Sequence, residues 1–359
     1  MINNSSNNIC YNDNSNVNNN NRLIVSHTYQ ANDPSEDRTC IINDKNNNNN
    51  NQRKQITAAA IFDGHGGDIV AEFASKRLLP ILLKKLSNNN KSNNNNNNNT
   101  NNDNNNNNDS NNFIDECILN TFNQIENEYI DGIKQAFEYG YGEVAKVGCC
   151  ALVSIIFDNK LVIANCGDCR AVLGSNVNEN IVSTRLSRDH NARMPLEQIY
   201  LKLLHPNEEN IIVCKNPHAC YVKGRLQLTR ALGDLYLKYS SFNAPFGSPR
   251  VRGRHIPEPY TPPYVSPIPE INHFQLQSHD KFVILATDGV WDFLTDEEAV
   301  KIVASCGNDS KKAAYALVEA TLERASSECG MTKSELMALP PGRKRRSRHD
   351  DTTAIVIYL

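Results

Sequence analysis

The stretch 56-ITAAAIFDGHGG-67 joins a short apolar run to a carboxylate, a histidine and three glycines. The run over 56–62 has the length and composition of a buried strand, and Asp63 and His65 follow at its end. Apolar residues then recur at helical spacing over 70–78, so we expect a helix there, and we expect Pro80 to break or restart it. This segment predicts a strand that ends at a group of polar residues and is followed by a helix.

Helical and extended patterns are mixed irregularly through the rest of the chain. A long apolar stripe predicts a helix over 113–138, and a capping box of Thr295 and Glu298 begins another helix that runs to about residue 304. Further segments predict a hairpin of 151–157 and 161–164 with its turn at Asp158 and Asn159, strands at 282–287 and 354–358, and a helix at 313–325. Because strands and helices do not alternate as regular βαβ units, we expect an α+β fold, a layered sandwich rather than a doubly wound sheet.

Asparagine-rich stretches interrupt this pattern at 3–21, 46–51, 88–99 and 101–112. Such polar runs cannot bury enough apolar surface to offset the entropy lost on ordering, so we predict that they are disordered, as neutral expansions rather than interaction segments. The 359-residue chain is long enough for two average domains or one large one. We expect a disordered tail over 1–21 and a single domain over 22–359, with disordered Asn-rich insertions at about 46–51 and 88–112.

The composition argues against several classes of protein. Lys and Arg total 37 against 40 Asp and Glu, and the resulting net charge of −3 argues against a dedicated nucleic-acid binder. No apolar run reaches the roughly 18 residues of a membrane span, and the first 22 residues hold no apolar core of signal-peptide length. Eleven cysteines, an odd number, favour reduced thiols over a disulfide framework in a chain without a secretion signal. These features predict a soluble intracellular protein.

Acidic residues flank three of the predicted strands. Asp63 and Asp288 each follow an apolar run and precede a glycine, and Asp350 and Asp351 precede the last strand. A lone Asp-Gly at a strand end is usually a turn. Three such clusters, with His65 beside the first, favour a site for a hard cation such as Mg²⁺ or Mn²⁺, which prefers carboxylate, carbonyl and water oxygens. Periodicity does not by itself show that the three clusters converge.

Six short blocks then occur in a characteristic order. They are 62-FDGHGG-67, 164-ANCGDCR-170, 187-SRDH-190, 229-TRALGD-234, 287-TDGVWD-292 and 349-HDDTT-353. In this set and order the chain resembles the metal-dependent protein phosphatases of type 2C, the PPM-type serine/threonine phosphatases. The resemblance covers nearly everything from about 22 to 359 apart from the asparagine tracts. It implies a four-layer α-β-β-α sandwich, in which two antiparallel sheets are flanked by helices and a metal site lies at one end.

The resemblance also implies an activity and a set of site residues. The activity is hydrolysis of phosphoserine and phosphothreonine in phosphoprotein substrates by a water that bridges two divalent metal ions, Mg²⁺ or Mn²⁺, with a weaker third ion. We also expect a monomer that, on its charge balance and lack of long apolar runs, binds neither nucleic acid nor membranes. Matched by position, His65 would be the general acid, Asp63 would bridge the two metals, and the carbonyl of Gly64 would bind the first metal. Asp288 and Asp350 would bind the second metal, and Asp168 would bind the third ion. Glu36 and Asp37 would act through bound water, and Asp292 would lie behind the ligands.

The main alternative is a pseudophosphatase, a binding or regulatory module that keeps the fold without turnover. Many family members have an arginine that grips the phosphate four residues before the Glu of the first acidic block, and here that position is Asn32. Against this alternative, the metal-ligand positions Asp63, Asp288 and Asp350 are all present. A nucleotide-binding dehydrogenase is disfavoured, because Asp63-Gly-His-Gly-Gly67 does not have the G-x-G-x-x-G spacing.

Two further patterns leave alternatives open. Cys166-x-x-Cys169 has redox or zinc spacing, but it lacks a second CxxC or paired histidines, so structural thiols are favoured. A cysteine phosphatase is disfavoured because no Cys-x5-Arg loop opens a helix. The basic run over 343–348 is most simply a solvated loop, with nuclear import or docking of acidic phosphosubstrates as alternatives.

Branch and location are less constrained than family. The strings over 31–38 and 261–264 resemble the pyruvate dehydrogenase phosphatase branch, whereas plant members carry strings similar to 224–231. A mitochondrial presequence is typically rich in arginine, but residues 1–21 contain no Arg or Lys. A cytoplasmic or nuclear location is therefore favoured, and a mitochondrial one stays open.

Overall fold

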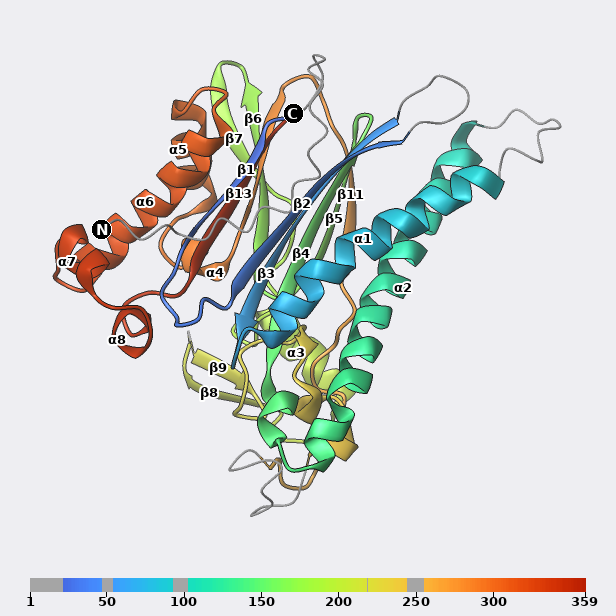
Figure 1. Cartoon of the computed structure of the whole chain (residues 1–359), viewed down its shortest axis with the longest axis vertical. Helices are drawn as coiled ribbons and strands as arrows, with labels where there is room; N and C mark the ends of the chain where they lie inside the picture. The colour runs from blue at the N-terminus through green and yellow to red at the C-terminus, as the bar shows by residue number, and fades with distance from the viewer. Residues whose placement is uncertain (1–21, 47–53, 93–102, 218, 244–254) are drawn as a thin grey trace.

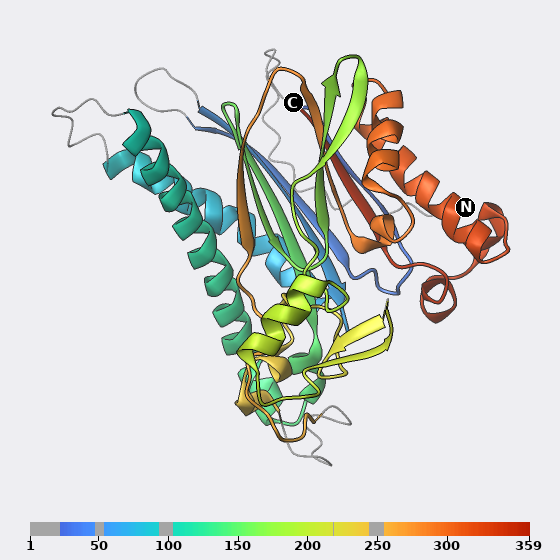
Figure 2. The same cartoon turned by 180° about the vertical axis from the view of Figure 1, so that it is seen from behind.

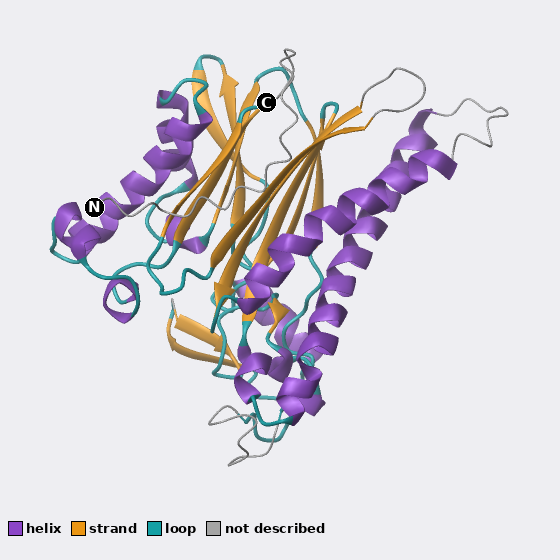
Figure 3. Ribbon diagram, viewed as in Figure 1, coloured by secondary structure: helices purple, strands orange, loops and turns teal. Residues whose placement is uncertain are grey.

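Two antiparallel sheets pack face to face, and helices cover both outer faces (Figures 1 and 3). The structure is a computed structural model that describes residues 22–46, 54–92, 103–217, 219–243 and 255–359. Its four layers confirm the predicted α-β-β-α sandwich. No helix in these described ranges is both long and apolar enough to cross a membrane.

Each sheet brings together strands that lie far apart in the sequence. The first sheet has the order β1 (Ile24–Tyr29), β13 (Thr352–Tyr358), β12 (Asp280–Ala286), β6 (Arg170–Val177) and β7 (Asn180–Arg185). The second has the order β11 (Glu270–Gln275), β5 (Lys160–Cys166), β4 (Gly148–Phe157), β3 (Lys54–His65) and β2 (Asp37–Asn46), and β10 (Leu232–Gly233) also pairs with β4.

Helices flank each sheet on its outer side. α1 (Ile69–Ser92) and α2 (Asp103–Glu138) cover the second sheet, while α5 (Asp296–Ser305) and α6 (Ser310–Glu328) cover the first (Figure 1). Three short helices complete this side: α4 (Asp288–Trp291) follows β12, and α7 (Lys333–Ala338) and α8 (Arg343–Arg346) lie in sequence between α6 and β13. A separate group of α3 (Pro195–Leu204), β8 (Ile212–Asn216) and β9 (Ala219–Val222) lies beyond the end of the sandwich where β3 ends (Figure 2). Short 3₁₀ turns η2 (Gly142–Lys146), η3 (Leu235–Leu237) and η4 (Ser240–Phe242) complete the described elements.

Buried apolar side chains form three layers between the four layers of backbone. On β3, Ala58, Ala60 and Phe62 face α1 and α2, whereas Ala59 and Ile61 face the other sheet. This alternation is the two-residue period of a strand that is buried on both faces. The same parity places Asp63 between the two sheets.

Most predicted elements are confirmed, with small changes at their ends. β4 and β5 form the expected hairpin, and Asp158 has the positive φ of 51° that a tight turn needs. Thr295 and Glu298 make both hydrogen bonds of the capping box at the start of α5. The prediction for Pro80 is wrong, because α1 continues through it. Fully buried leucines at 78, 79 and 82 flank this exposed proline, and their packing outweighs the roughly 3 kcal/mol that an interior proline costs a helix.

The predicted asparagine-rich insertion over 88–112 is shorter in the structure. α1 extends to Ser92 and α2 begins at Asp103, so both ends of the predicted insertion are helical. Once a helix has formed, each added residue gains a hydrogen bond, so a weak helix former such as asparagine can extend it. The predicted tail 1–21 lies outside the described residues, and so does the predicted insertion over 46–51 except for Asn46, which is the last residue of β2.

The cysteine prediction needs one correction. Cys214 and Cys220 form a disulfide, with their sulfur atoms 2.02 Å apart. The two residues lie directly opposite each other in the β8–β9 ladder, so the hairpin itself brings the thiols together. A count of cysteines could not reveal that pairing. The other described cysteines are free, as expected.

Candidate active site

Three neighbouring strands place a row of polar side chains at one end of the second sheet. Asp63 on β3 lies directly opposite Asp37 on β2 and directly opposite Cys150 on β4. The apolar residues before Asp63 alternate in facing, and Asp63 has the parity of Ile61, which lies between the sheets. The row therefore faces the space between the two sheets.

A carboxylate cluster forms where this row meets the other sheet. Asp63, Asp168 and Asp288 each offer an oxygen within 4.8 Å of the others. Asp168 lies in the turn before β6, and Asp288 begins α4 directly after β12. The structure thus brings together three of the predicted metal-site residues from three separate sequence blocks.

Asp37 and Asp350 approach this cluster from its edges. Asp37 accepts hydrogen bonds from the hydroxyls of Thr353, at 2.6 Å, and Thr287, at 3.3 Å. Asp350 forms an ion pair with Arg346 at 2.5 Å and accepts a hydrogen bond from the side-chain amide of Asn32. Both carboxylates lie close enough to raise the pKa of Asp63.

Asp351 has a different role from its neighbour Asp350. It accepts hydrogen bonds from the backbone N–H groups of Ala31, Asn32 and Glu36. Asp351 therefore holds the loop before β2 in place beside the carboxylates, which positions Glu36 at the site.

The carboxylates of the cluster repel one another when they are ionised. Burial, then the charges of Asp288 and Asp37, raise the pKa of Asp63 well above its usual value. Burial, then the charges of Asp168 and Asp350, do the same to the pKa of Asp288. Among the described residues, Asp37 Oδ1 and Asp288 Oδ1 are buried and have no hydrogen-bond partner. Unpaired carboxylate oxygens in a group of this kind fit hard divalent cations.

A divalent cation should stabilise the protein more at neutral than at acidic pH. The folded protein holds the raised-pKa protons more tightly than the unfolded chain does, so these groups contribute stability below the usual aspartate pKa of about 4 and lose it as pH rises through the raised values. A bound cation offsets that loss. We expect Mn²⁺ at 100 times its dissociation constant to add about 2.7 kcal/mol at pH 7.5, and so to raise the melting temperature by roughly 4 °C, with a smaller rise at pH 5.

The same thermal measurement has an internal control. Asp288→Asn removes one of the repelling charges, so in excess chelator at pH 7.5 this variant should unfold at a higher temperature than the wild type. The variant should also lose most of the Mn²⁺ effect. Equal Mn²⁺ effects at both pH values would contradict this account of the site.

His65 lies two residues after Asp63 and is held by a residue that the sequence analysis gave no role. Its Nε2 is 2.7 Å from Oδ2 of Asp234, and about a quarter (25%) of its side chain is exposed. Burial by itself lowers the pKa of His65, but the charge and hydrogen bond of Asp234 and other nearby carboxylates leave that pKa raised. Gly148 lies against this pair, because a Cβ there would be 2.2 Å from Asp234 Oδ2 and 2.6 Å from His65 Nε2.

The backbone around Asp234 is fixed by two distant segments. The N–H of Gly233 donates to Glu126 on α2, and the N–H of Asp234 donates to the carbonyl of Val147. Asp234 itself has a left-handed φ of 50°. The signal for its role was present in the block over 229–234, but only the structure shows that it contacts His65.

The remaining residues that the sequence predicted for the site lie near the carboxylate cluster. The N–H of Gly64 donates to the carbonyl of Glu36 at 3.2 Å, so the predicted metal-binding segments of β3 and the loop before β2 are in contact. Asp168 is held by Asn191, at 2.8 Å, and by the thiol of Cys150, at 3.3 Å. Asp292 is an exposed carboxylate with Arg193 at 3.8 Å. Metal ligation by these residues stays a prediction.

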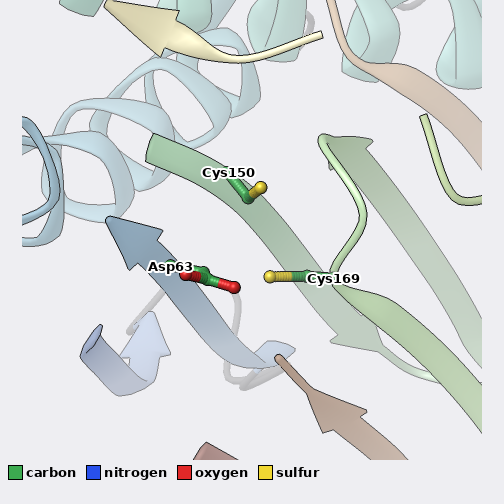
Figure 4. A group of neighbouring side chains, drawn as sticks. All are labelled: Asp63, Cys150 and Cys169. Carbon is green, nitrogen blue, oxygen red and sulfur yellow. The ribbon is translucent and has the colours of Figure 1, made fainter. Parts of the chain in front are cut away.

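The CxxC pair is split between two layers of the core. Cys166 packs under α1 and α2, whereas Cys169 packs between the sheets. Cys169 instead lies beside Cys150, and both sulfurs are within 4.8 Å of an oxygen of Asp63 (Figure 4). The structure thus agrees with structural thiols rather than a Cys166–Cys169 pair, and the neighbour of Cys169 is Cys150 on a strand of the opposite sheet.

Comparison with known proteins agrees with this arrangement. A family profile described as Protein phosphatase 2C matches residues 22–330. The protein named probable protein phosphatase 2C 67 from Arabidopsis thaliana is 36% identical over 245 residues, which cover 68% of this chain and 64% of that protein. Probable protein phosphatase 2C 64 from the same plant is also 36% identical over 245 residues, 68% of this chain and 59% of that protein. The chain thus spans less than two thirds of the length of these relatives.

Solved structures share the fold. The crystal structure of a serine-threonine phosphatase 2C from Toxoplasma gondii aligns with a TM-score of 0.59 at 16% identity, and covers 94% of this chain and 99% of that one. The structure of a C. elegans sex determining protein aligns with a TM-score of 0.58 at 16% identity, and covers 94% of this chain and 65% of that one. On the profile match and the ordered motif blocks, the chain belongs to the protein phosphatase 2C family.

Proposed function

We propose that this protein is an active Mg²⁺- or Mn²⁺-dependent serine/threonine protein phosphatase. The observation that carries the proposal is the group of Asp63, Asp168 and Asp288 between the sheets, of which Asp168 is buried and the other two are partly buried, with His65 at the end of the same strand as Asp63. Family membership supports the reaction class, and the complete set of carboxylates favours turnover.

The roles of this chain's residues follow from the chemistry. Two divalent cations would lower the pKa of the attacking water, so that hydroxide is available at neutral pH. Asp63, Asp288 and Asp350, with the carbonyl of Gly64, would hold these cations, and Asp37 and Glu36 would hold their water ligands. The leaving serine or threonine oxygen is a poor leaving group unless it is protonated. With Nε2 of His65 held by Asp234, Nδ1 is the nitrogen that remains to donate that proton.

Arg346 is the best placed cation to bind the substrate phosphate. A cavity of about 370 Å³ opens beside Glu36 and Gly66, and its wall includes Asn32, Arg343 and Arg346. Asn32, which stands where an arginine was expected, donates its side-chain amide to Asp350 and Asp351. The basic run thus contributes two guanidinium groups to the site, which favours the phosphosubstrate alternative for that segment.

Arg346→Ala should raise the KM for a phosphothreonine peptide by about tenfold, with a smaller change in kcat. A charge-assisted hydrogen bond to phosphate contributes roughly 1.5–3 kcal/mol, and one tenfold step corresponds to about 1.4 kcal/mol. Lys344→Ala is the matched control, because Lys344 is an exposed cation of the same helix that does not line the cavity. Mn²⁺ titrations of each variant separate phosphate binding from an effect through Asp350. An unchanged KM, or the same rise in Lys344→Ala, would exclude this role.

A pseudophosphatase remains the second candidate, favoured by Asn32 alone. As further proposals, the substrates are phosphoproteins, the protein acts as a monomer without nucleic acid or membranes, and it resides in the cytoplasm or nucleus.

A further inference from the structure

Two thiols and a carboxylate converge beside the candidate active site. One oxygen of Asp63 and the sulfurs of Cys150 and Cys169 all lie within 4.8 Å of one another. In Figure 4 the side chains of Asp63, on β3, and Cys169, just before β6, point toward each other, and the side chain of Cys150 on β4 lies near them. Asp63 and Cys150 are direct cross-strand partners, and Cys169 reaches them from the other sheet.

The group is held rigidly in the core. Cys150 and Cys169 are at most 2% exposed. A Cβ on Gly167, whose φ is +126°, would lie 2.4 Å from the sulfur of Cys150, so the turn before β6 packs directly on this thiol. Cys150 also donates a hydrogen bond to Asp168. A site of this kind needs little rearrangement to accept an ion.

The three ligand atoms match the preferences of a soft cation. Zn²⁺ binds thiolate sulfur at about 2.3 Å and carboxylate oxygen at about 2.0–2.2 Å, so ligand atoms on one tetrahedral ion lie roughly 3.5–3.8 Å apart. Small side-chain rotations would bring the observed atoms to those separations. Mg²⁺ and Mn²⁺ prefer oxygen ligands and would not select the thiols.

The carboxylate cluster and the thiol cluster share one residue. Asp63 belongs both to the group with Asp168 and Asp288 and to the group with Cys150 and Cys169. An ion bound to the thiols would therefore compete for the oxygens of Asp63 with the site that we propose for the hard cations.

We propose that Asp63, Cys150 and Cys169 form a second metal site, selective for soft divalent cations such as Zn²⁺, whose occupation antagonises the Mg²⁺/Mn²⁺ site. On binding, two S–H bonds break, two metal–sulfur bonds and one metal–oxygen bond form, and the two thiol protons, with a third from Asp63 where it is protonated, pass to solvent. The ligands then carry three negative charges against the two positive charges of the ion, and a fourth coordination position stays open. The binding part stands on geometry alone, whereas the antagonism rests on the proposed function.

Burial and nearby charges set the protonation of both thiols. The hydrogen bond with Cys169 lowers the pKa of Cys150, but burial and the charge of Asp168 raise that pKa to about 11. Burial also raises the pKa of Cys169. The thiols therefore stay protonated and unreactive until a cation compensates their charge.

The test is a binding titration of the full chain with Co²⁺, which substitutes for Zn²⁺ and reports thiolate ligation by a near-ultraviolet charge-transfer band. Thiol reductants are left out because they bind the metal themselves. We expect one equivalent to produce the band in the wild type, and Zn²⁺ to abolish it. Cys150→Ala and Cys169→Ala should each weaken binding by at least about tenfold.

Cys149→Ala is the matched control. Cys149 is the neighbour of Cys150 on β4 and is equally buried, but it faces α1 and α2. This variant should keep the band. Cys150→Ser and Cys169→Ser, which retain a polar group of similar size, serve if an alanine variant does not fold. A band that persists when both Cys150 and Cys169 are replaced, or that disappears with Cys149 alone, would overturn the proposal.

Phosphatase assays then test the antagonism separately. In the presence of Mn²⁺, the Zn²⁺ concentration that halves activity should rise at least about tenfold when Cys150 and Cys169 are replaced, each protein being compared with its own activity without Zn²⁺. The charge-transfer band without any phosphatase activity would support the thiol site and count against the proposed function. Phosphatase activity without the charge-transfer band would support the proposed function and count against the thiol site.

Discussion

Asp288→Asn should reduce phosphate release from a phosphothreonine peptide by about 10³-fold or more. Asp288 is a partly buried carboxylate of the cluster, and its buried Oδ1 has no hydrogen-bond partner among the described residues. An amide of the same shape would leave the neighbouring backbone in place but would remove the charge that holds a divalent cation. Losing a preorganised electrostatic interaction at the reacting group alone costs about 10²–10³-fold, and losing the cation would also remove the activated water.

The measurement compares Mn²⁺, Mg²⁺ and excess chelator in both proteins. Asp131→Asn, an exposed carboxylate on α2, is the control for loss of a charge and should have no effect. Wild-type activity that needs metal and is lost in Asp288→Asn would support the proposed mechanism. No release with any metal from folded wild-type protein would favour the pseudophosphatase, and Asn32→Arg would then be the first variant to restore activity. Full activity in Asp288→Asn would contradict the site as we describe it.

The sequence predicted the fold well where the signals were local. The apolar run before Asp63 was found as a strand because its length and composition are those of a buried strand. Thr295 and Glu298 marked a helix start because their side chains contact the backbone within one turn. Pro80 was misjudged because its effect depends on leucines that pack against other elements.

The part of the site that the sequence predicted also depends on local signals. Asp63 and Asp288 could be found because each precedes a glycine at a strand end, and their family motifs placed them together. Contacts such as His65 with Asp234, 169 residues apart, and Arg346 beside the cavity depend on how distant segments pack. The contact of Cys150 with Cys169 depends on how the two sheets pack against each other, which residue spacing does not encode.

His65→Gln should slow hydrolysis of a phosphothreonine peptide by about 10²–10⁴-fold, the usual contribution of a general acid. An alkoxide leaving group must be protonated as the bond to phosphorus breaks. The nitrophenolate released from p-nitrophenyl phosphate is stable without a proton. We therefore expect a much smaller loss of kcat on p-nitrophenyl phosphate. The ratio of the loss on the peptide to the loss on p-nitrophenyl phosphate measures how much catalysis depends on proton donation by His65.

The same ratio distinguishes proton donation from structural damage. Asp234→Asn keeps the shape of the partner of His65 but removes its charge, so it should shift both activities in the direction of His65→Gln, with a smaller difference between the substrates. A variant that disturbed the metal site instead would lose activity equally on both, because the attacking water is common to both reactions. Equal losses in His65→Gln would therefore rule out a general acid at this position and would point to a role in holding the end of β3, where Asp63 lies two residues away.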